Sequence, residues 1–327
     1  MFRSVSGGYA KLGFIALSLL STIGALHAQT YPTHLVRIIV PFAAGGLNDT
    51  AARFIQPYLE KAFGQSVIIE NRPAASGVVG ADAVAKAAPD GHTLLMVASS
   101  YTVLPATIAK LPYDSERDFA PIALIGKNPL LFVVNAKVPA KTLGEFVALA
   151  KANPGKLNYA TPGAATQTRL VAELWSQRAG IKMQHIPYRG GAPAIQAVVA
   201  GDTEFTVISP LVSLPQIKAG YLRVLAAGSL ARDPQLPDVP TVAESGFPGF
   251  EAIQWVGLLT TAGTPKDVVD RLNAEVNKAL KDSDLIAKLA QQGMLPAGGT
   301  SAQFQALIAT EIVNWKAAAL AAAIKPE

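Results

Sequence analysis

The sequence of 327 residues contains no cysteine. This absence excludes a disulfide framework, a metal site built on thiolates and a cysteine nucleophile. Charged residues are also few, at 16% of the chain, whereas 50% of residues are hydrophobic and the mean hydropathy is +0.30. Such a chain can bury a large core, which excludes a disordered or coiled-coil protein, and its length suggests two domains.

Basic charge is in shallow excess and is not clustered along the sequence. The net charge of +5 comes from 28 Lys and Arg against 23 Asp and Glu, with no basic run of five or more residues. A protein that binds nucleic acid is expected to gather its charge on one face. We therefore predict no nucleic-acid partner.

The usual sequence signatures of catalysis and cofactor binding are missing. No G-x-S-x-G, G-x-G-x-x-G or G-x-x-x-x-G-K-[ST] motif occurs. The chain has four histidines, and His34, His92 and His185 lie far apart without the spacing of a helical zinc motif. We predict no catalytic residues, no metal and no cofactor.

The N-terminus has the layout of a secretory signal peptide. Arg3 and Lys11 precede an uncharged stretch from Leu12 to Leu26, and the small residue Ala28 follows it. The apolar stretch is shorter than the roughly 20 residues that span a bilayer. We predict export to the periplasm with cleavage after residue 28, and an uncleaved anchor is the alternative.

Short apolar runs alternate with amphipathic or alanine-rich stretches along the rest of the chain. In the first hundred residues after the signal, this alternation predicts parallel strands with helices on both faces of the sheet, which is an α/β fold. Thr142, Thr264 and Thr300 are predicted to cap helix starts. The predicted strands are Leu35–Pro41, Val67–Glu70, Leu94–Ala98, Ile122–Ile125, Leu130–Val134, Leu157–Ala160, Met183–Ile186, Phe205–Ile208, Leu222–Ala226 and Trp255–Thr261.

One unit, a strand followed by a glycine turn and a helix, occurs near Gly45 and again near Gly163. Helix N-termini present unpaired N–H groups and a positive potential, so each unit is a candidate site for a carboxylate or phosphate. A purely structural turn is the alternative at Gly45–Gly46. If the two units face each other across a cleft between two domains, they can hold one anion together.

Several longer motifs follow one another in a recognisable order. They are Val40–Gly46 (VPFAAGG), Glu70–Pro73 (ENRP), Ala87–Leu94 (AAPDGHTL), Thr161–Gly163 (TPG), Ile186–Gly190 (IPYRG) and Leu236–Glu244 (LPDVPTVAE). With these motifs the sequence resembles the Bug-type substrate-binding proteins of tripartite tricarboxylate transport systems. The resemblance extends from about Tyr31 to Glu327.

The resemblance implies a fold and a division of the chain. The implied fold is an α/β, two-lobed periplasmic binding protein of the type II, Venus-flytrap class, with crossing strands between the lobes. After the signal peptide at 1–28, lobe 1 is expected to comprise 29–128 and 227–327, and lobe 2 to comprise 129–226. A monomer is expected.

The resemblance also places the ligand. A carboxylate is expected between two loops, 42–46 after the first strand and 161–166 in the other lobe, where backbone amides and hydroxyls hold it. Ser99 and Ser100 either contact the ligand or cap a helix, and Tyr188 either walls the cleft or packs in the core. The candidate ligand-binding residues are Phe42, Ala43, Ala44, Gly45, Gly46, Ser99, Ser100, Thr161, Gly163, Ala165, Thr166, Tyr188 and Ile208.

Some positions near the expected ligand depart from the family pattern. Where relatives commonly have Gly and His, this chain has Ala165 and Arg169. Arg169 either adds a cation for a polyanionic ligand or faces solvent on its helix. Relatives often carry Asp where this chain has Ala197 and Ile208. Since an acidic group would suit a ligand amine, Ile208 favours a carboxylate that lacks one.

The expected function is the capture of a small organic carboxylate for the membrane permease subunits of a tripartite tricarboxylate-type system. Presentation of the ligand to a membrane sensor kinase is the alternative, because closure on a ligand serves both outputs. A periplasmic enzyme that acts on carboxylates is a distant third, since no catalytic motif supports it. The sequence does not identify the carboxylate.

Overall fold

The computed structural model describes residues 1–2, 31–233, 236–291, 293–321 and 326. Residues 3–28 of the predicted signal segment lie outside the described residues. Within the described part of the chain, no helix has both the length and the apolar character needed to cross a membrane. The predicted export signal is therefore not tested by the structure.

The first sheet has six strands in the order β11-β4-β10-β3-β1-β2. β1 pairs in parallel with β2 and β3, as the sequence predicts, whereas β10 runs antiparallel to β3 and β4. The strands are β1 (Val36–Val40), β2 (Val67–Asn71), β3 (Thr93–Ala98), β4 (Phe119–Pro129), β10 (Ile253–Thr261) and β11 (Leu295–Pro296). We call the unit built on this sheet lobe 1.

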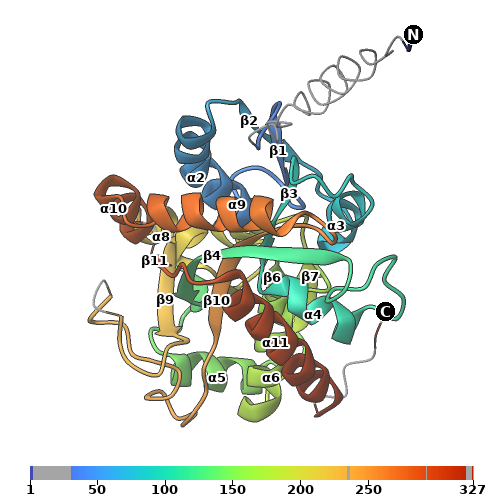
Figure 1. The fold of residues 1–327 in the computed structure, drawn as a ribbon. Coiled ribbons are helices and arrows are strands. Elements are labelled where there is room, and N and C mark those ends of the chain that lie inside the picture. The colour runs from blue at the N-terminus through green and yellow to red at the C-terminus, as the bar shows by residue number, and fades with distance from the viewer. Residues whose placement is uncertain (3–30, 234–235, 292, 322–325, 327) are drawn as a thin grey trace.

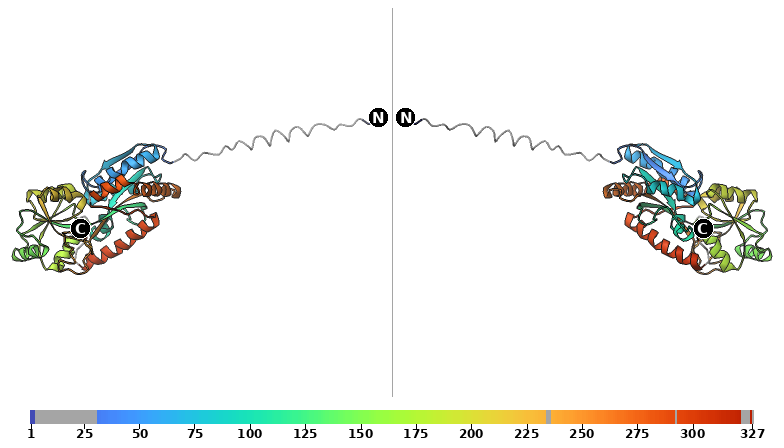
Figure 2. Two further views of the ribbon diagram at one scale, coloured as in Figure 1. Left: turned by 90° about the vertical axis from the view of Figure 1, so that its left-hand side faces the viewer. Right: turned by 90° about the vertical axis from the view of Figure 1, so that its right-hand side faces the viewer.

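The second sheet has five strands in the order β7-β6-β8-β5-β9 and forms the basis of lobe 2. β6 lies parallel to β7 and β8, whereas β5 is antiparallel to β8 and β9. The strands are β5 (Leu131–Asn135), β6 (Asn158–Thr161), β7 (Gln184–Pro187), β8 (Phe205–Ile208) and β9 (Leu222–Ala227). In Figure 2 the green and yellow elements of lobe 2 lie to one side of the blue and orange elements of lobe 1.

Helices cover both faces of the first sheet. Successive residues of β1 point to opposite faces, so Ile38 and Ile39 enter different cores. Ile38 packs with α2 (Leu47–Phe63), α9 (Lys266–Ala279) and α10 (Ser283–Gln291). Ile39 packs with α3 (Val78–Ala85), α4 (Ser100–Thr107) and α11 (Ser301–Ala321). The short helix η1 (Ala75–Gly77) precedes α3.

Lobe 2 has a separate aromatic core. Trp175, Phe132 and Phe205 are fully buried, with the Trp175 and Phe205 ring centroids 5.4 Å apart. Val242 and Phe250 join this core, so the chain packs on lobe 2 past residue 227, where the sequence analysis places its return to lobe 1. The helices of lobe 2 are α5 (Leu143–Ala152), α6 (Gln167–Ala179), α7 (Gly191–Ala200) and α8 (Pro210–Lys218).

The lobes are joined where β4 leads into β5 and where the chain re-enters the first sheet at β10. Figure 1 labels the two strands of lobe 1 at these junctions, β4 and β10. The two long strands β4 and β10 pair along their length. On β10, a Cβ added at Gly257 would lie 2.3 Å from Phe304 of α11, so only glycine fits beneath that ring. This contact fixes α11 against the crossing strands.

The predicted helix caps agree with the structure at two of three positions. The Thr142 hydroxyl accepts from the Glu145 amide, and the Thr300 hydroxyl accepts from the Gln303 amide. The prediction for Thr264 is wrong, because its hydroxyl donates to the Thr261 carbonyl and α9 begins after Pro265 without a side-chain cap. Thr264 closes the preceding turn instead.

Candidate ligand-binding site

The N-termini of five helices converge on one cavity between the lobes. Its walls include the first turns of α2 and α4 from lobe 1, and the starts of α6, α7 and α8 from lobe 2. The space measures about 30 Å³ in this arrangement of the lobes, which is enough to hold a water molecule. The lining residues are Phe42, Gly46, Leu47, Asn48, Ala98, Ser100, Pro162, Thr168, Gly191, Ile208, Ser209, Val212 and Gln254.

Local sequence explains why helices begin there. Gly46 precedes α2 in an extended conformation, with φ −83° and ψ 177°, and contributes no side chain to the cavity wall. Ser209 precedes α8, accepts from the Leu211 amide, and is followed by Pro210 at the first helical position. Gly190 has φ 136°, a conformation that favours glycine, and lets the start of α7 approach Ala43 of lobe 1.

No charged side chain among the described residues lines the cavity, so the helix starts determine its electrostatic character. The first amides of each helix lack intrahelical acceptors, and the peptide dipoles place partial positive charge there. An anion can therefore accept several hydrogen bonds without a buried Arg or Lys that would itself need desolvation. The geometry suits a carboxylate.

The carboxylate of Asp49 stabilises the first loop, residues 42–46. Its buried carboxylate accepts from the Gly45 amide at 2.9 Å, from the Arg53 guanidinium at 2.9 and 3.0 Å, and from the Asn71 amide at 3.0 Å. Burial alone would raise the pKa of Asp49, but the hydrogen bonds from Arg53, Gly45 and Asn71 together hold it below its ordinary value. Asn71 also donates to the Phe42 carbonyl, so loop and helix are tied together.

Polar contacts join the two lobes beside the cavity. The Ser99 hydroxyl donates to Gln167 Oε1 at 2.6 Å, and the Ser100 hydroxyl accepts from the Gln167 amide at 3.1 Å. The Ser76 hydroxyl accepts from the Ala165 amide at 3.1 Å. These contacts hold the lobes in the closed arrangement seen in this structure.

Phe42 separates this cavity from a second one. The second space measures about 190 Å³ and is lined by the 73–77 segment of lobe 1 and by the 162–164 and 187–189 segments of lobe 2. Phe42 and Pro162 belong to both linings. A rotation of the Phe42 ring would therefore connect the small cavity to the larger one.

The candidate residues from the sequence fall into two groups. Those that line one or both cavities are Phe42, Gly46, Ser100, Gly163, Tyr188 and Ile208. Others make contacts outside these linings: Ser99 bridges the lobes, the Ala165 amide donates to Ser76, and the Thr161 and Thr166 hydroxyls donate to the Gly163 carbonyl. Ala43, Ala44 and Gly45 form the loop between β1 and Gly46, and Ala44 and Gly45 are exposed.

Several cavity residues were not among the sequence candidates. Asn48, Thr168, Gly191, Ser209 and Gln254 all line the cavity. The Ser209-Pro210 pair directly after a strand is a recognisable helix start and could have been found from the sequence. Gln254 gives no such signal, because its position depends on how β10 crosses between the lobes.

Arg169 lies outside both cavity linings. Its guanidinium donates to the Ala164 carbonyl at 2.9 Å. Arg169 also acts on Tyr159: burial and the charge of Glu173 raise the pKa of Tyr159, and Arg169 lowers it. In this arrangement of the lobes, the Arg169 side chain therefore interacts with the loop of residues 161–166.

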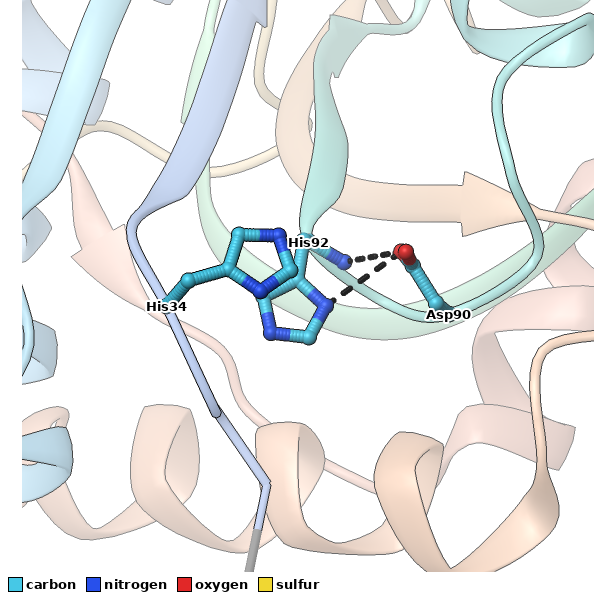
Figure 3. A group of neighbouring side chains, drawn as sticks. All are labelled: His34, Asp90 and His92. Atoms are coloured by element: carbon cyan, nitrogen blue, oxygen red, sulfur yellow. Dashed lines mark hydrogen bonds and ion pairs between the residues drawn. The ribbon is translucent and has the colours of Figure 1, made fainter. Parts of the chain in front are cut away.

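A cluster of His34, Asp90 and His92 forms away from the cavity, although the two histidines are far apart in sequence (Figure 3). The imidazole rings stack with centroids 3.7 Å apart and planes at 6°. Nitrogen lone pairs lie in the ring plane, so one ion cannot lie in both of these parallel planes. His92 Nε2 also accepts from the Thr33 amide at 3.2 Å. The cluster anchors the chain before β1 rather than forming a metal centre.

A family profile described as "Tripartite tricarboxylate transporter family receptor" matches residues 51–323. The chain belongs to this family. It is 38% identical over 307 residues to the "UPF0065 protein in tcbD-tcbE intergenic region" of Pseudomonas sp. strain P51, covering 93% of this chain and 91% of the relative. It is 36% identical to Protein BugT of Bordetella pertussis, covering 88% and 89% of the two chains.

Solved structures of similar proteins share the fold of this family member. R. palustris Rpa4515 with adipate has a TM-score of 0.88 and 32% identity, covering 91% of this chain and all of that one. MatC from Rhodopseudomonas palustris with bound malate has a TM-score of 0.85 and 34% identity, covering 88% and 99%. The predicted two-lobed fold and family are confirmed.

Proposed function

We propose that this family member is a periplasmic, non-enzymatic receptor that captures a small organic carboxylate and delivers it to the permease subunits of a tripartite tricarboxylate-type transporter. The observation that carries the proposal is the convergence of five helix N-termini on one uncharged cavity between the lobes. Two related structures that bind adipate and malate support the ligand class. Export through the predicted signal and action as a monomer complete the proposal.

The residues that line the cavity limit which carboxylates it can bind. Ile208, Leu47 and Val212 present apolar surface between the helix starts, and no described lining residue is acidic. An ammonium group placed there would lose its hydration without gaining a counter-charge. We therefore propose a mono- or dicarboxylate with an aliphatic or aromatic body and no amine.

Substitution at Gly46 tests whether the helix N-termini around the inter-lobe cavity bind an anion. Its backbone is in the extended region, and an added Cβ would lie 3.3 Å from the Ala43 carbonyl, so a small side chain needs only a slight shift. Gly46→Asn and Gly46→Asp introduce nearly the same volume, but only Asp adds a negative charge. Two like charges about 4 Å apart repel by about 4 kcal/mol at an effective dielectric of 20.

We expect Gly46→Asp to bind malate or adipate at least about thirtyfold more weakly than Gly46→Asn does, as measured by isothermal titration calorimetry. Gly144→Asp, at an open position on α5, controls for the added charge and should bind like wild type. Equal affinities of the Gly46→Asn and Gly46→Asp variants would show that the carboxylate lies elsewhere.

A further inference from the structure

Two amide side chains lie next to each other on the strands that cross between the lobes. Asn128 of β4 is paired with Gln254 of β10. Paired residues of an antiparallel ladder point to the same face of the sheet, with Cβ atoms about 5 Å apart. Because Gln254 lines the inter-lobe cavity, Asn128 also lies on the cavity side of the crossing strands. We call Asn128 and Gln254 the floor of the cavity.

Both floor residues carry a buried acceptor without a partner. Asn128 is 1% exposed and Gln254 is 5% exposed. Asn128 Oδ1 and Gln254 Oε1 have no hydrogen-bond partner within the described chain. A buried acceptor that is left unpaired costs free energy, and such acceptors are rare in folded proteins. A ligand that donates a hydrogen bond at the floor would remove this cost.

The neighbours of Asn128 determine the orientation of its amide. Asn128 Nδ2 donates to Ser209 Oγ at 3.0 Å and to the Pro129 carbonyl at 3.4 Å. A carbonyl oxygen can only accept, so the NH₂ group faces this side and Oδ1 faces away from it. Ser209 lines the cavity, and its hydroxyl also accepts from the Leu211 amide at 3.3 Å. Neither bond uses the proton of the Ser209 hydroxyl, which is therefore available to a ligand.

The chemistry of the floor matches an alcohol group. No described residue that lines the cavity carries a charge, so an ammonium group there would lose its hydration without gaining a counter-charge. An ammonium group also cannot accept from Ser209. A hydroxyl group both donates and accepts, so it can pair with an amide oxygen of the floor and with the Ser209 proton. A methylene group would leave all of these groups unpaired.

We infer that the ligand is a hydroxycarboxylate, and that Asn128 and Gln254 determine this specificity. The hydroxyl group of the ligand donates to the floor and accepts from Ser209, while its carboxylate lies at the helix N-termini. The inference rests on the proposed function, because it adds a hydroxyl group to the carboxylate that the cavity is proposed to bind. Ser209 acts as a positioning residue for Asn128 as well as a donor to the ligand.

Two series of acids test the inference by isothermal titration calorimetry. Succinate, malate and aspartate differ only in whether one carbon carries hydrogen, hydroxyl or ammonium, and phenylacetate, mandelate and phenylglycine differ in the same way. Both enantiomers of each chiral acid are measured. In at least one series, we expect the hydroxy acid to bind at least tenfold more tightly than its two counterparts.

The other outcomes of these titrations are distinguishable. Equal binding of the hydroxy acid and its hydroxyl-free counterpart would show that water satisfies the floor, and would overturn the inference while leaving the proposed function intact. Binding of the amino acid as tight as that of the hydroxy acid would also overturn it, because the floor would then accept an ammonium group. Failure of all six acids to bind would contradict the proposed function, and this inference with it.

Substitutions at the floor locate the recognition of the hydroxyl group. Gln254→Met and Asn128→Leu each remove one acceptor at nearly constant side-chain size, and Gln305→Met, at an exposed position on α11, is the matched control. Each floor variant should reduce the preference for the hydroxy acid at least threefold, whereas Gln305→Met should keep the wild-type preference. Both acids are titrated against the same variant, so a general loss of folded protein affects them alike. A wild-type preference in every floor variant that folds, as judged by circular dichroism, would overturn the assignment.

Discussion

Asp49→Asn should destabilise lobe 1 by an amount that follows from its contacts. The carboxylate is 3% exposed and accepts four hydrogen bonds, of which those from Gly45 and Asn71 are partly buried. Asparagine keeps one carbonyl oxygen and turns an NH₂ group toward one pair of these donors. A hydrogen bond to a charged group contributes about 1.5–3 kcal/mol.

Arg53 contributes less to this cost, because its side chain is 53% exposed and such ion pairs contribute about 0.2–1 kcal/mol. We therefore expect Asp49→Asn to cost about 3 kcal/mol and Arg53→Met less than about 1 kcal/mol. Urea unfolding at pH 7, followed by circular dichroism, should show a lower midpoint at an unchanged slope for Asp49→Asn.

The pH dependence of stability provides an independent measure. Because the folded-state pKa of Asp49 lies below its unfolded value, its stabilisation is present above the unfolded pKa and is lost as the pH falls through the folded pKa. The difference between wild type and Asp49→Asn should shrink in acid. A cost below about 1 kcal/mol, or an equal cost for Arg53→Met, would refute the reasoning.

Three further predictions test other parts of the structure. Phe42→Ala should join the two cavities, and thermal-shift screening should then show stronger responses to bulkier carboxylates; an unchanged ranking would contradict the role of this ring. Gly257→Ala should cost about 1–3 kcal/mol through its clash with Phe304, whereas Gly144→Ala should not destabilise the protein, and equal urea midpoints would refute this. Burial raises the folded-state pKa of Glu311, so the wild-type protein should lose stability as the pH rises from the unfolded pKa of this carboxyl through its folded pKa. Glu311→Gln should remove this loss, and an unchanged pH profile of the unfolding free energy would contradict the prediction.

Much of the fold could be predicted because its signals are local. Apolar runs such as Val36–Val40 and Phe205–Ile208 are too short and too β-branched or aromatic for helices, and they form strands where predicted. The antiparallel β10 was not predicted, since its direction depends on how the chain returns from lobe 2. The same return determines that Val242 and Phe250 pack on lobe 2.

The site was predicted in part, for a similar reason. The two glycine loops are visible in the sequence because each follows a strand and opens a helix. Thr168 and Gln254 enter the cavity only because the lobes close on each other, which no local pattern encodes. Ser99 follows a strand, a place that predicts either a ligand contact or a helix cap, and its hydroxyl also makes a contact that no local pattern encodes, a hydrogen bond to Gln167 Oε1 of the other lobe.

The most direct test of the central claim compares dicarboxylates with their uncharged diamides. Isothermal titration calorimetry of malate and adipate, each beside its diamide, measures whether the converging helix N-termini select negative charge. The account predicts saturable binding of at least one dicarboxylate and at least about a hundredfold weaker binding of its diamide, because only the carboxylate gains charge-assisted hydrogen bonds. Equal binding of acid and diamide would contradict the claim.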